Sequence, residues 1–277
     1  MRKFSILLTV LVLSILALSG CKEKQSDNKT ESTPAKTSAA EQPVAIANNS
    51  AELSVESDAK SGNYGCPGNV KLLKSITMGD DTRKFEYDAT SKVVNIIRYY
   101  EGKQIYTQTV VYDDNQVVAV NRSDDGSESI SYSVSADGLR AETKGQQFLG
   151  VYNVQGGYLN RIGSESGEEI FHYQGGNLVK TTGKDNEYQS SYAIGYKYDN
   201  KKSPLSNSKS PKWFLQFFFS EFYLGLNNNI IEYEFNSGGE GDSHITFVFE
   251  YGSDGFPTKR TKTVDGDTET TTFTYCN

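Results

Sequence analysis

Two histidines, His172 and His244, are the only imidazoles in this 277-residue sequence, so metal and acid–base chemistry is sought there first. His172 lies in Phe171-His172-Tyr173, and alternation points it away from the two aromatic side chains. A zinc site needs three or four converging ligands, and no cluster of cysteine and histidine supplies them. We therefore expect both histidines to face solvent, and we predict no metal site and no cofactor.

Serine and carboxylate patterns give no stronger indication of catalysis. Gly163–Gly167 has the outline of a nucleophile elbow, but Glu165 stands where the serine belongs, which favours a hairpin loop. Asp265, Asp267 and Glu269 alternate as calcium ligands could, yet an EF-type loop needs more oxygens and a fixed spacing. Asp265-Gly266 is better explained as a hairpin turn. We predict no catalytic residue.

Residues 1–20 have the pattern of a cleaved secretory leader. Arg2 and Lys3 supply positive charge, and the almost wholly apolar run from Phe4 to Leu18 is too short to span a bilayer comfortably. Leu18-Ser19-Gly20-Cys21 resembles the lipobox of bacterial lipoproteins. That resemblance implies that Cys21 is acylated, with palmitate as an expected acyl group, becomes the new N-terminus and holds the protein at a membrane.

The other two cysteines, Cys66 and Cys276, are then the only pair in an exported, oxidising compartment. They flank almost the whole region that we expect to fold. A disulfide between them would close a very long loop, for which the chain-entropy model gives a stabilisation of up to about 5 kcal/mol. Two unpaired buried thiols are the alternative.

Charge restricts the partners. The formal net charge is −7, and it becomes more negative when Arg2 and Lys3 leave with the leader. So acidic a surface repels phosphate backbones, which argues against nucleic acid as a partner. No later segment reaches the apolar length of a transmembrane helix, so the lipid is the expected membrane contact.

Composition divides the mature chain into two parts. Residues 21–63 comprise the lipidated cysteine and a polar stretch without aromatic residues, which cannot bury enough apolar surface to order itself, so we predict a flexible tether. Residues 64–277 show period-two alternation typical of strands buried on one side. Examples of one-sided sets are Ile130, Tyr132 and Val134; Tyr192, Ile194, Tyr196 and Tyr198; Ile231, Tyr233 and Phe235; and Ile245, Phe247, Phe249 and Tyr251.

Tyrosines mark a repeat in this region. Tyr87, Tyr112, Tyr132, Tyr152, Tyr173 and Tyr198 recur every 20–25 residues. Most begin a unit made of an aromatic residue, a polar turn and a branched apolar strand, which is the size of one hairpin. We predict an all-β fold: an antiparallel up-and-down meander that forms a rolled sheet or a soluble β-barrel. Aromatic abundance suits cross-strand packing, with a sugar- or peptide-binding face as the alternative.

One segment departs from the strand pattern. Ser210-Pro211 suits a helix start and Gly225 suits its end. Phe214, Phe217, Phe218 and Phe222 recur at helical spacing. We predict one short helix over about 211–224, with this phenylalanine stripe closing the mouth of the curled sheet.

Two resemblances follow from these motifs. The tyrosine-aspartate units resemble YD/Rhs-type repeats. The run Tyr198-Asp199-Asn200-Lys201-Lys202-Ser203-Pro204, followed by the helix and Leu226-Asn227-Asn228-Asn229, more closely resembles an uncharacterised family of bacterial lipoproteins described as a domain of unknown function with a porin-like fold. That likeness spans about residues 66–277. It implies a rolled antiparallel sheet or barrel and brings no catalytic residues.

Together these patterns predict a lipid-anchored envelope protein with a non-enzymatic binding or scaffolding β-domain. The expected ligand is a glycan, a peptide or another envelope protein. Lys22 and Glu23 after the acylated cysteine are compatible with delivery to the outer membrane. These residues do not decide whether the domain faces the periplasm or the cell exterior. The alternatives are a carbohydrate-processing enzyme that uses carboxylates gathered from the turns, and a structural or adhesive envelope protein.

Overall fold

The structure is a computed structural model that describes residues 65–114, 116–123, 128–135, 138–143, 146–155, 157–164, 167–186, 190–237 and 242–276. The chain divides into two units, Met1–Gly62 and Asn63–Asn277, and every described residue belongs to the second. The expected leader (1–20), Cys21 and the expected tether (21–63) lie outside the described residues.

Sixteen strands make up nearly all of the described residues, with a short helix and a 3₁₀ turn between two of them. The strands are β1 (Leu73–Met78), β2 (Asp81–Tyr87), β3 (Val93–Tyr100), β4 (Lys103–Asp113), β5 (Gln116–Ser123), β6 (Glu128–Ser135), β7 (Gly138–Thr143), β8 (Gln146–Gln155), β9 (Tyr158–Ser164), β10 (Gly167–Gln174), β11 (Asn177–Asp185), β12 (Ser190–Lys202), β13 (Asn228–Asn236), β14 (Ser243–Tyr251), β15 (Pro257–Val264) and β16 (Asp267–Tyr275). The helical elements are α2 (Lys212–Phe219) and η1 (Ser220–Phe222).

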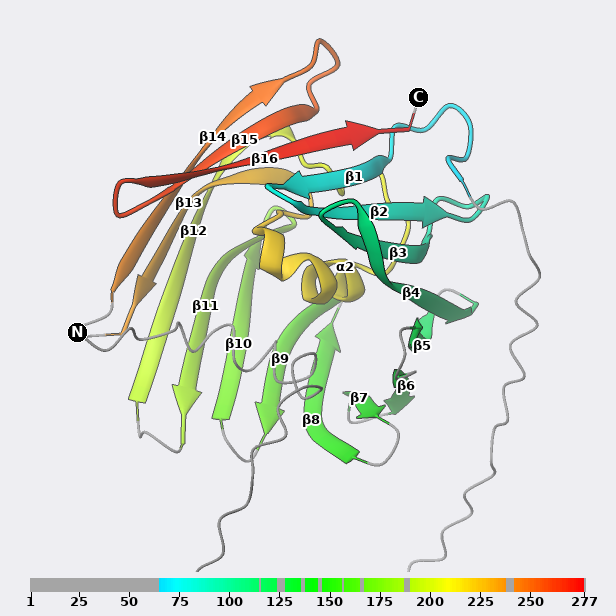
Figure 1. The fold of residues 1–277 in the computed structure, drawn as a ribbon. Coiled ribbons are helices and arrows are strands. Elements are labelled where there is room, and N and C mark those ends of the chain that lie inside the picture. Colours follow the sequence, from blue (N-terminus) through cyan, green and yellow to red (C-terminus); the bar gives the residue numbers. More distant parts are fainter. Residues whose placement is uncertain are drawn as a thin grey trace, which may run out of the picture. The chain divides into compact units, whose positions relative to one another are not determined.

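The strands follow one another around a single rolled sheet. Each pairs antiparallel with its sequence neighbours, and β1 pairs with β16, for example Ile76 opposite Phe273. The strand order therefore closes on itself as a barrel (Figure 1). This confirms the predicted all-β antiparallel meander, which forms a rolled sheet. Short connections between consecutive strands permit only antiparallel neighbours.

Alternation along the strands separates an inner from an outer face. In β14, Ile245 and Phe247 are buried on one face, as the sequence predicts, whereas Val248 on the other face is 67% exposed. In β13 Tyr233 is buried as predicted, but the prediction is wrong at Ile231, because a register shift opposite Lys197 and Tyr198 inserts an extra residue there. The bulge makes Ile230 the buried residue and leaves Ile231 half-buried.

The repeated tyrosines tie the two strands of a hairpin together at one end of the barrel. Each of five hydroxyls donates to the backbone carbonyl near the start of the preceding strand, at 2.6–2.8 Å. The pairs are Tyr87 to Leu73, Tyr112 to Val93, Tyr173 to Leu159, Tyr198 to Leu178 and Tyr275 to Pro257. We call this end of the barrel the tyrosine rim. The opposite end, where each odd-numbered strand turns into the next even-numbered strand, is the hairpin end. The side chains of Tyr132 and Tyr152 lie outside what is described.

The rim tyrosines thus have a structural role, since each hydroxyl donates a hydrogen bond to a backbone carbonyl of the preceding strand. Burial raises the pKa of all five hydroxyls above the ordinary tyrosine value. The repeat predicted from the sequence is therefore a hairpin repeat, and the hydrogen bonds of these hydroxyls explain why tyrosine recurs in it.

The helix lies within the ring of strands and fills it from the tyrosine rim (Figure 1). The Trp213 N–H donates to the Gly157 carbonyl at 3.0 Å, and the Phe219 ring packs 5.1 Å from that of Phe85 in β2. Beyond the helix, the carbonyl of Phe222 accepts a hydrogen bond from Arg260 of β15. Contacts to strands on several sides show that this segment is a plug in the barrel.

The predicted short helix is present, but its expected Ser210 cap is wrong. The α-helix spans Lys212–Phe219 and continues only as the η1 turn, because Tyr223 adopts a left-handed conformation two residues before Gly225. Ser210 does not cap it: its hydroxyl accepts from the Val93 N–H at 2.9 Å and pairs with Tyr112.

The buried set of the plug also differs from the predicted stripe. Phe214 and Phe222 are buried as expected, but Phe217 and Phe218 are only half-buried. The other buried side chains are Trp213, Leu215 and Phe219. A helix enclosed by a barrel is covered on more than one side, so helical spacing on one face underestimates its core.

The predicted disulfide between Cys66 and Cys276 is present. It joins the segment before β1 to the end of β16, at the seam where the first and last strands pair. The Cys276 N–H also donates to the Leu72 carbonyl at 2.8 Å. The seam is therefore held by a covalent bond as well as by the ladder.

Candidate functional site

Polar side chains collect on the inner face toward the hairpin end, beyond the helical plug. Arg83 shares the inner face of β2 with Phe85, and Lys262 of β15 places its Nζ 5.1 Å from the Tyr223 ring. We call this set the interior polar layer; it consists of Asp81, Arg83, Arg98, Tyr106, Arg122, Glu169, Tyr192, Lys262 and Glu269. In each of the strands β2, β3, β10, β12, β15 and β16, the members of this set lie within about three residues of the strand terminus at the hairpin end.

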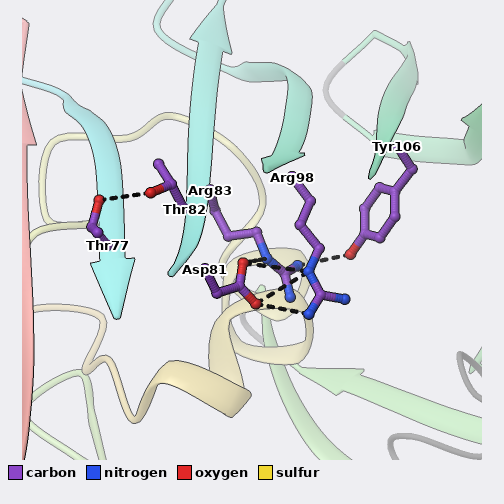
Figure 2. A network of polar contacts seen from close by, with 6 residues as sticks. All are labelled: Thr77, Asp81, Thr82, Arg83, Arg98 and Tyr106. Atoms are coloured by element: carbon purple, nitrogen blue, oxygen red, sulfur yellow. Dashed lines mark hydrogen bonds and ion pairs between the residues drawn. The ribbon is translucent and has the colours of Figure 1, made fainter. Parts of the chain in front are cut away.

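Four strands, β2 to β5, position its most connected part, the arginine cluster: Asp81, Arg83, Arg98, Tyr106 and Arg122. Figure 2 shows the first four of these residues. Arg98 donates through Nη2 to Asp81 Oδ2 at 2.8 Å and through Nε to the same oxygen at 3.1 Å. Arg83 donates through Nε to Asp81 Oδ1 at 3.3 Å and through Nη1 to the Tyr106 hydroxyl at 2.8 Å. One carboxylate thus bridges two guanidinium groups.

Tyr106 forms the centre of the cluster. Arg122 lies with its Cζ 4.3 Å from the ring centroid, and the Cζ atoms of Arg83 and Arg98 lie at 5.7 and 5.9 Å. Cations at these distances over a phenol ring are attracted by its electron-rich face. Gln108, two residues further along β4, is buried beside them.

The ladder makes this grouping energetically costly. Arg83 and Arg98 are direct cross-strand partners, as are Arg98 and Tyr106 in the next pair of strands. Like charges directly opposite one another in a sheet are destabilising, and Arg83 is largely removed from water. Asp81 and the Tyr106 ring offset part of that cost.

A second group, on strands β10 to β12, brings a buried carboxyl together with aromatic rings. Glu169 of β10 is 5% exposed and accepts a hydrogen bond from the hydroxyl of Tyr192 in β12. Tyr192 reaches it by crossing over Gly183 of β11, where any side chain would overlap the ring. Burial raises the pKa of the Glu169 carboxyl above its usual range, and the Tyr192 hydrogen bond opposes that shift.

Arg260 of β15 fastens the plug to the wall. It is 1% exposed, donates to the Phe222 carbonyl and to Thr271 Oγ1, and leaves Nε without a hydrogen-bond partner. Burial lowers the pKa of its guanidinium to about 10, and the charges of Glu269 and Tyr223 oppose that shift. The Phe247 ring lies 5.0 Å from its Cζ. This arginine stays charged at neutral pH and has a positioning role.

The interior polar layer is suited to binding. Guanidinium groups present planar forks of donors that match carboxylate, sulfate and phosphate. Among the described residues, no group of three or more histidine, cysteine, aspartate or glutamate side chains could hold a metal ion. Glu169 has Tyr192 as its partner, and Asp81 is engaged by two arginines, so neither is arranged as a nucleophile beside a base.

The residues first considered for chemistry lie elsewhere. His172 and His244 are exposed on the outer face as predicted, with His244 Nε2 3.2 Å from Glu232 Oε1. Asp265-Gly266 is the β15–β16 turn, with positive φ angles of 51° and 91° that suit a tight hairpin. Gly163–Gly167 connects β9 to β10, and Glu165 lies outside the described residues, as does Cys21. Of these, only Glu269 belongs to the interior polar layer.

The arginine cluster was missed, although a signal for it was present in the sequence. Asp81 and Arg83 stand at the same alternate positions as Phe85 and Tyr87, so a charged residue shares the apolar side of that strand. Charges were expected on the solvent side of each strand, and the inner positions of Asp81 and Arg83 in β2 contradict that expectation.

Within the described part of the chain, no helix has the length and apolar character needed to cross a membrane.

No protein-family model and no curated protein matches the chain. Among solved structures, a porin-like protein from Bacteroides uniformis ATCC 8492 is similar at 14% identity and a TM-score of 0.48, over 74% of this chain and 96% of that one. A porin-like protein from Bacteroides vulgatus ATCC 8482 is similar at 10% identity and a TM-score of 0.39, over 74% and 99%. Likenesses at these scores carry no functional inference. Membership of the lipoprotein family and likeness to YD/Rhs repeats stay predictions.

Proposed function

We propose that this protein is a lipid-anchored envelope protein whose barrel is a non-enzymatic binding domain, with its ligand received at the interior polar layer. The observation that carries the proposal is the arginine cluster on the inner face. Charged groups placed inside a sheet cost free energy, so a fold that keeps several of them together there has a use for them.

The outer face supports a barrel that stands in water on its lipid tether. Outward positions of neighbouring strands carry paired charges: Lys197 Nζ lies 2.8 Å from Glu232 Oε1, and Lys259 Nζ lies 2.8 Å from Glu250 Oε1. The hydrogen bond from Lys197 lowers the pKa of the Glu232 carboxyl. A lipid-facing band would instead present apolar side chains at these positions.

The binding test uses the lipidated full-length protein in non-ionic detergent micelles. Neutral sugars, acidic sugars and tripeptides are titrated while the emission of Trp213 is followed. Trp213 is the single tryptophan and is buried in the plug, so binding next to the plug should shift its emission. Binding should also raise the melting temperature, because a ligand at 100 times its Kd stabilises the folded state by about 2.7 kcal/mol.

The same mixtures separate this proposal from its rivals. Mass spectrometry should recover every ligand intact; turnover of a saccharide would establish the carbohydrate-processing alternative. Self-association without any bound compound would favour a structural or adhesive role. The mass of the N-terminal peptide reports the anchor, and an unmodified Cys21 would refute the lipoprotein part of the proposal.

A further inference from the structure

We infer that the tyrosine rim docks on the anionic phospholipid headgroups of the membrane that holds the anchor. The contact is made by residues 201–212, which lead from β12 into the plug; we call them the basic segment, and its cations are Lys201, Lys202, Lys209 and Lys212. This inference rests on the proposed function, because the lipid anchor brings the rim to a membrane. It adds an interaction surface and an orientation of the barrel.

The basic segment differs in charge from the rest of the chain. From residue 200 to residue 220 the sequence contains four lysines and no aspartate or glutamate, whereas the whole chain carries a formal net charge of −7. The side chains of all four lysines are exposed. Among the described residues, no carboxylate forms an ion pair with any of these four side chains. Their charge is therefore available to a partner outside the protein.

The basic segment crosses the mouth of the barrel at the tyrosine rim. It starts where β12 ends, at Lys202. The Lys209 N–H donates to the Ser91 carbonyl of the β2–β3 turn at 3.0 Å. Lys212 places its Nζ 4.5 Å from the centroid of the Tyr158 ring, at the start of β9. Contacts to strands on different sides of the barrel spread the four cations over one end of it, as docking on a flat surface requires.

The described aspartates nearest the basic segment have other partners. Asp254, in the β14–β15 turn, forms an ion pair with Lys71. Asp199 precedes the segment in β12 and accepts a hydrogen bond from the Tyr251 hydroxyl. Asp88, in the β2–β3 turn, accepts from backbone N–H groups of its own turn. The four lysines and Lys71 together outnumber these three carboxylates, so this surface is locally cationic.

The chain that carries the anchor enters the barrel at the same end. The Gly65 carbonyl accepts from the Tyr87 N–H at 3.2 Å, and Cys66 is bonded to Cys276 one residue later. As a flexible coil, the expected tether over residues 21–63 has an end-to-end distance of about 35–40 Å. Such a tether gives the rim a high effective concentration at the lipid surface without pressing the rim against it. The lysines supply that second contact.

Electrostatic attraction to an anionic leaflet is additive over cations that reach it. Each lysine close to such a surface raises the ratio of docked to undocked protein by about fivefold. The attraction falls off within a Debye length of about 10 Å at 0.1 M salt, so the rim must touch the headgroups to gain from it. A barrel docked by its rim holds the hairpin end, and with it the interior polar layer, away from the lipid.

The experiment places the lipidated full-length protein on vesicles that contain dansyl-labelled headgroups. One set is made of phosphatidylcholine, and the other is an equal mixture of phosphatidylcholine and phosphatidylglycerol. Trp213 is the single tryptophan and follows Lys212 directly, so energy transfer from it to dansyl reports the approach of the rim. We expect at least about twofold more transfer on the anionic vesicles, and we expect about 0.5 M salt to abolish the difference.

Matched variants locate the docking surface. Replacing all four lysines of the basic segment with glutamine should lower the transfer on anionic vesicles to the neutral level. The control removes the same charge from exposed positions outside the segment and should keep the transfer; its lysines are Lys84, Lys103, Lys180 and Lys184. Two double variants, Lys201→Gln with Lys202→Gln and Lys209→Gln with Lys212→Gln, should each lose part of the difference. They keep the test valid if the fourfold variant fails to fold.

Flotation of the same vesicles separates this inference from the proposed function. Protein that floats with both kinds of vesicle but shows equal transfer on them keeps the anchor and refutes the docking. Equal losses in the basic-segment and control variants also overturn the inference. Protein that floats only with anionic vesicles, and no longer does so in the fourfold variant, supports the docking and refutes the anchor. If it floats with neither, both fail.

Discussion

Replacing Gly183 with alanine should displace Tyr192 from its place across β11. A methyl group at Gly183 would overlap the Tyr192 ring, and the ring can escape only by swinging away from Glu169. The buried carboxyl then loses its donor, at a cost of about 1–3 kcal/mol. The ring also leaves Phe235, 5.6 Å away, which adds about 0.5–1.5 kcal/mol. We expect a total loss of about 2–4 kcal/mol in the free energy of unfolding.

Urea unfolding followed by Trp213 fluorescence and circular dichroism measures this loss. Gly195→Ala in β12 is the matched control, because a methyl group there meets no atom within 4 Å and should change stability by less than about 0.5 kcal/mol. Tyr192→Phe completes a double-mutant cycle. If Gly183→Ala acts by displacing the hydroxyl, its cost should fall by about 1–2 kcal/mol when the hydroxyl is already gone. Equal effects at Gly183 and Gly195, or strict additivity with Tyr192→Phe, would refute the reasoning.

Three further outcomes are expected. Tyr87→Phe should lower the free energy of unfolding by about 1–3 kcal/mol in urea titrations, because the buried Leu73 carbonyl loses its donor, while Tyr100→Phe at a 47% exposed position should have almost no effect. Raising the pH above the ordinary tyrosine value of 10.0 should destabilise the fold, since burial raises the pKa of the rim hydroxyls and the unfolded chain ionises first; a urea midpoint that stays flat from pH 9 to 11 would contradict this. Reduction of Cys66–Cys276 should lower stability by up to about 5 kcal/mol at neutral pH, as measured by unfolding with and without dithiothreitol, and an unchanged midpoint would argue against the chain-entropy account.

Much of the fold could be predicted because its signals are local. Alternation in β14, the Asp265-Gly266 turn and the helical spacing of the aromatic residues in α2 each act within one element, and the structure contains the strand, turn and helix that they predict. The disulfide followed from compartment and from the number of cysteines. These features need no knowledge of which strand lies beside which.

The candidate site could not be predicted in the same way, because it depends on register. Arg83 and Arg98 become neighbours only when β2 pairs with β3 in one particular alignment, and Tyr106 joins them through β4. The bulge that exchanges Ile230 for Ile231 likewise arises from pairing with β12. Each of these features depends on how two strands pair, and the residue pattern of one strand does not show that pairing.

The position of the disulfide has a mechanical consequence. The described chain begins at Gly65, which forms a bridge with Tyr87 at the tyrosine rim, and Cys66 is bonded to Cys276 one residue later. A pull applied through the preceding residues reaches β16 through the covalent bond as directly as it reaches β1 through the backbone. The first and last strands therefore share the load, and the seam between them cannot open from this end while the bond is intact.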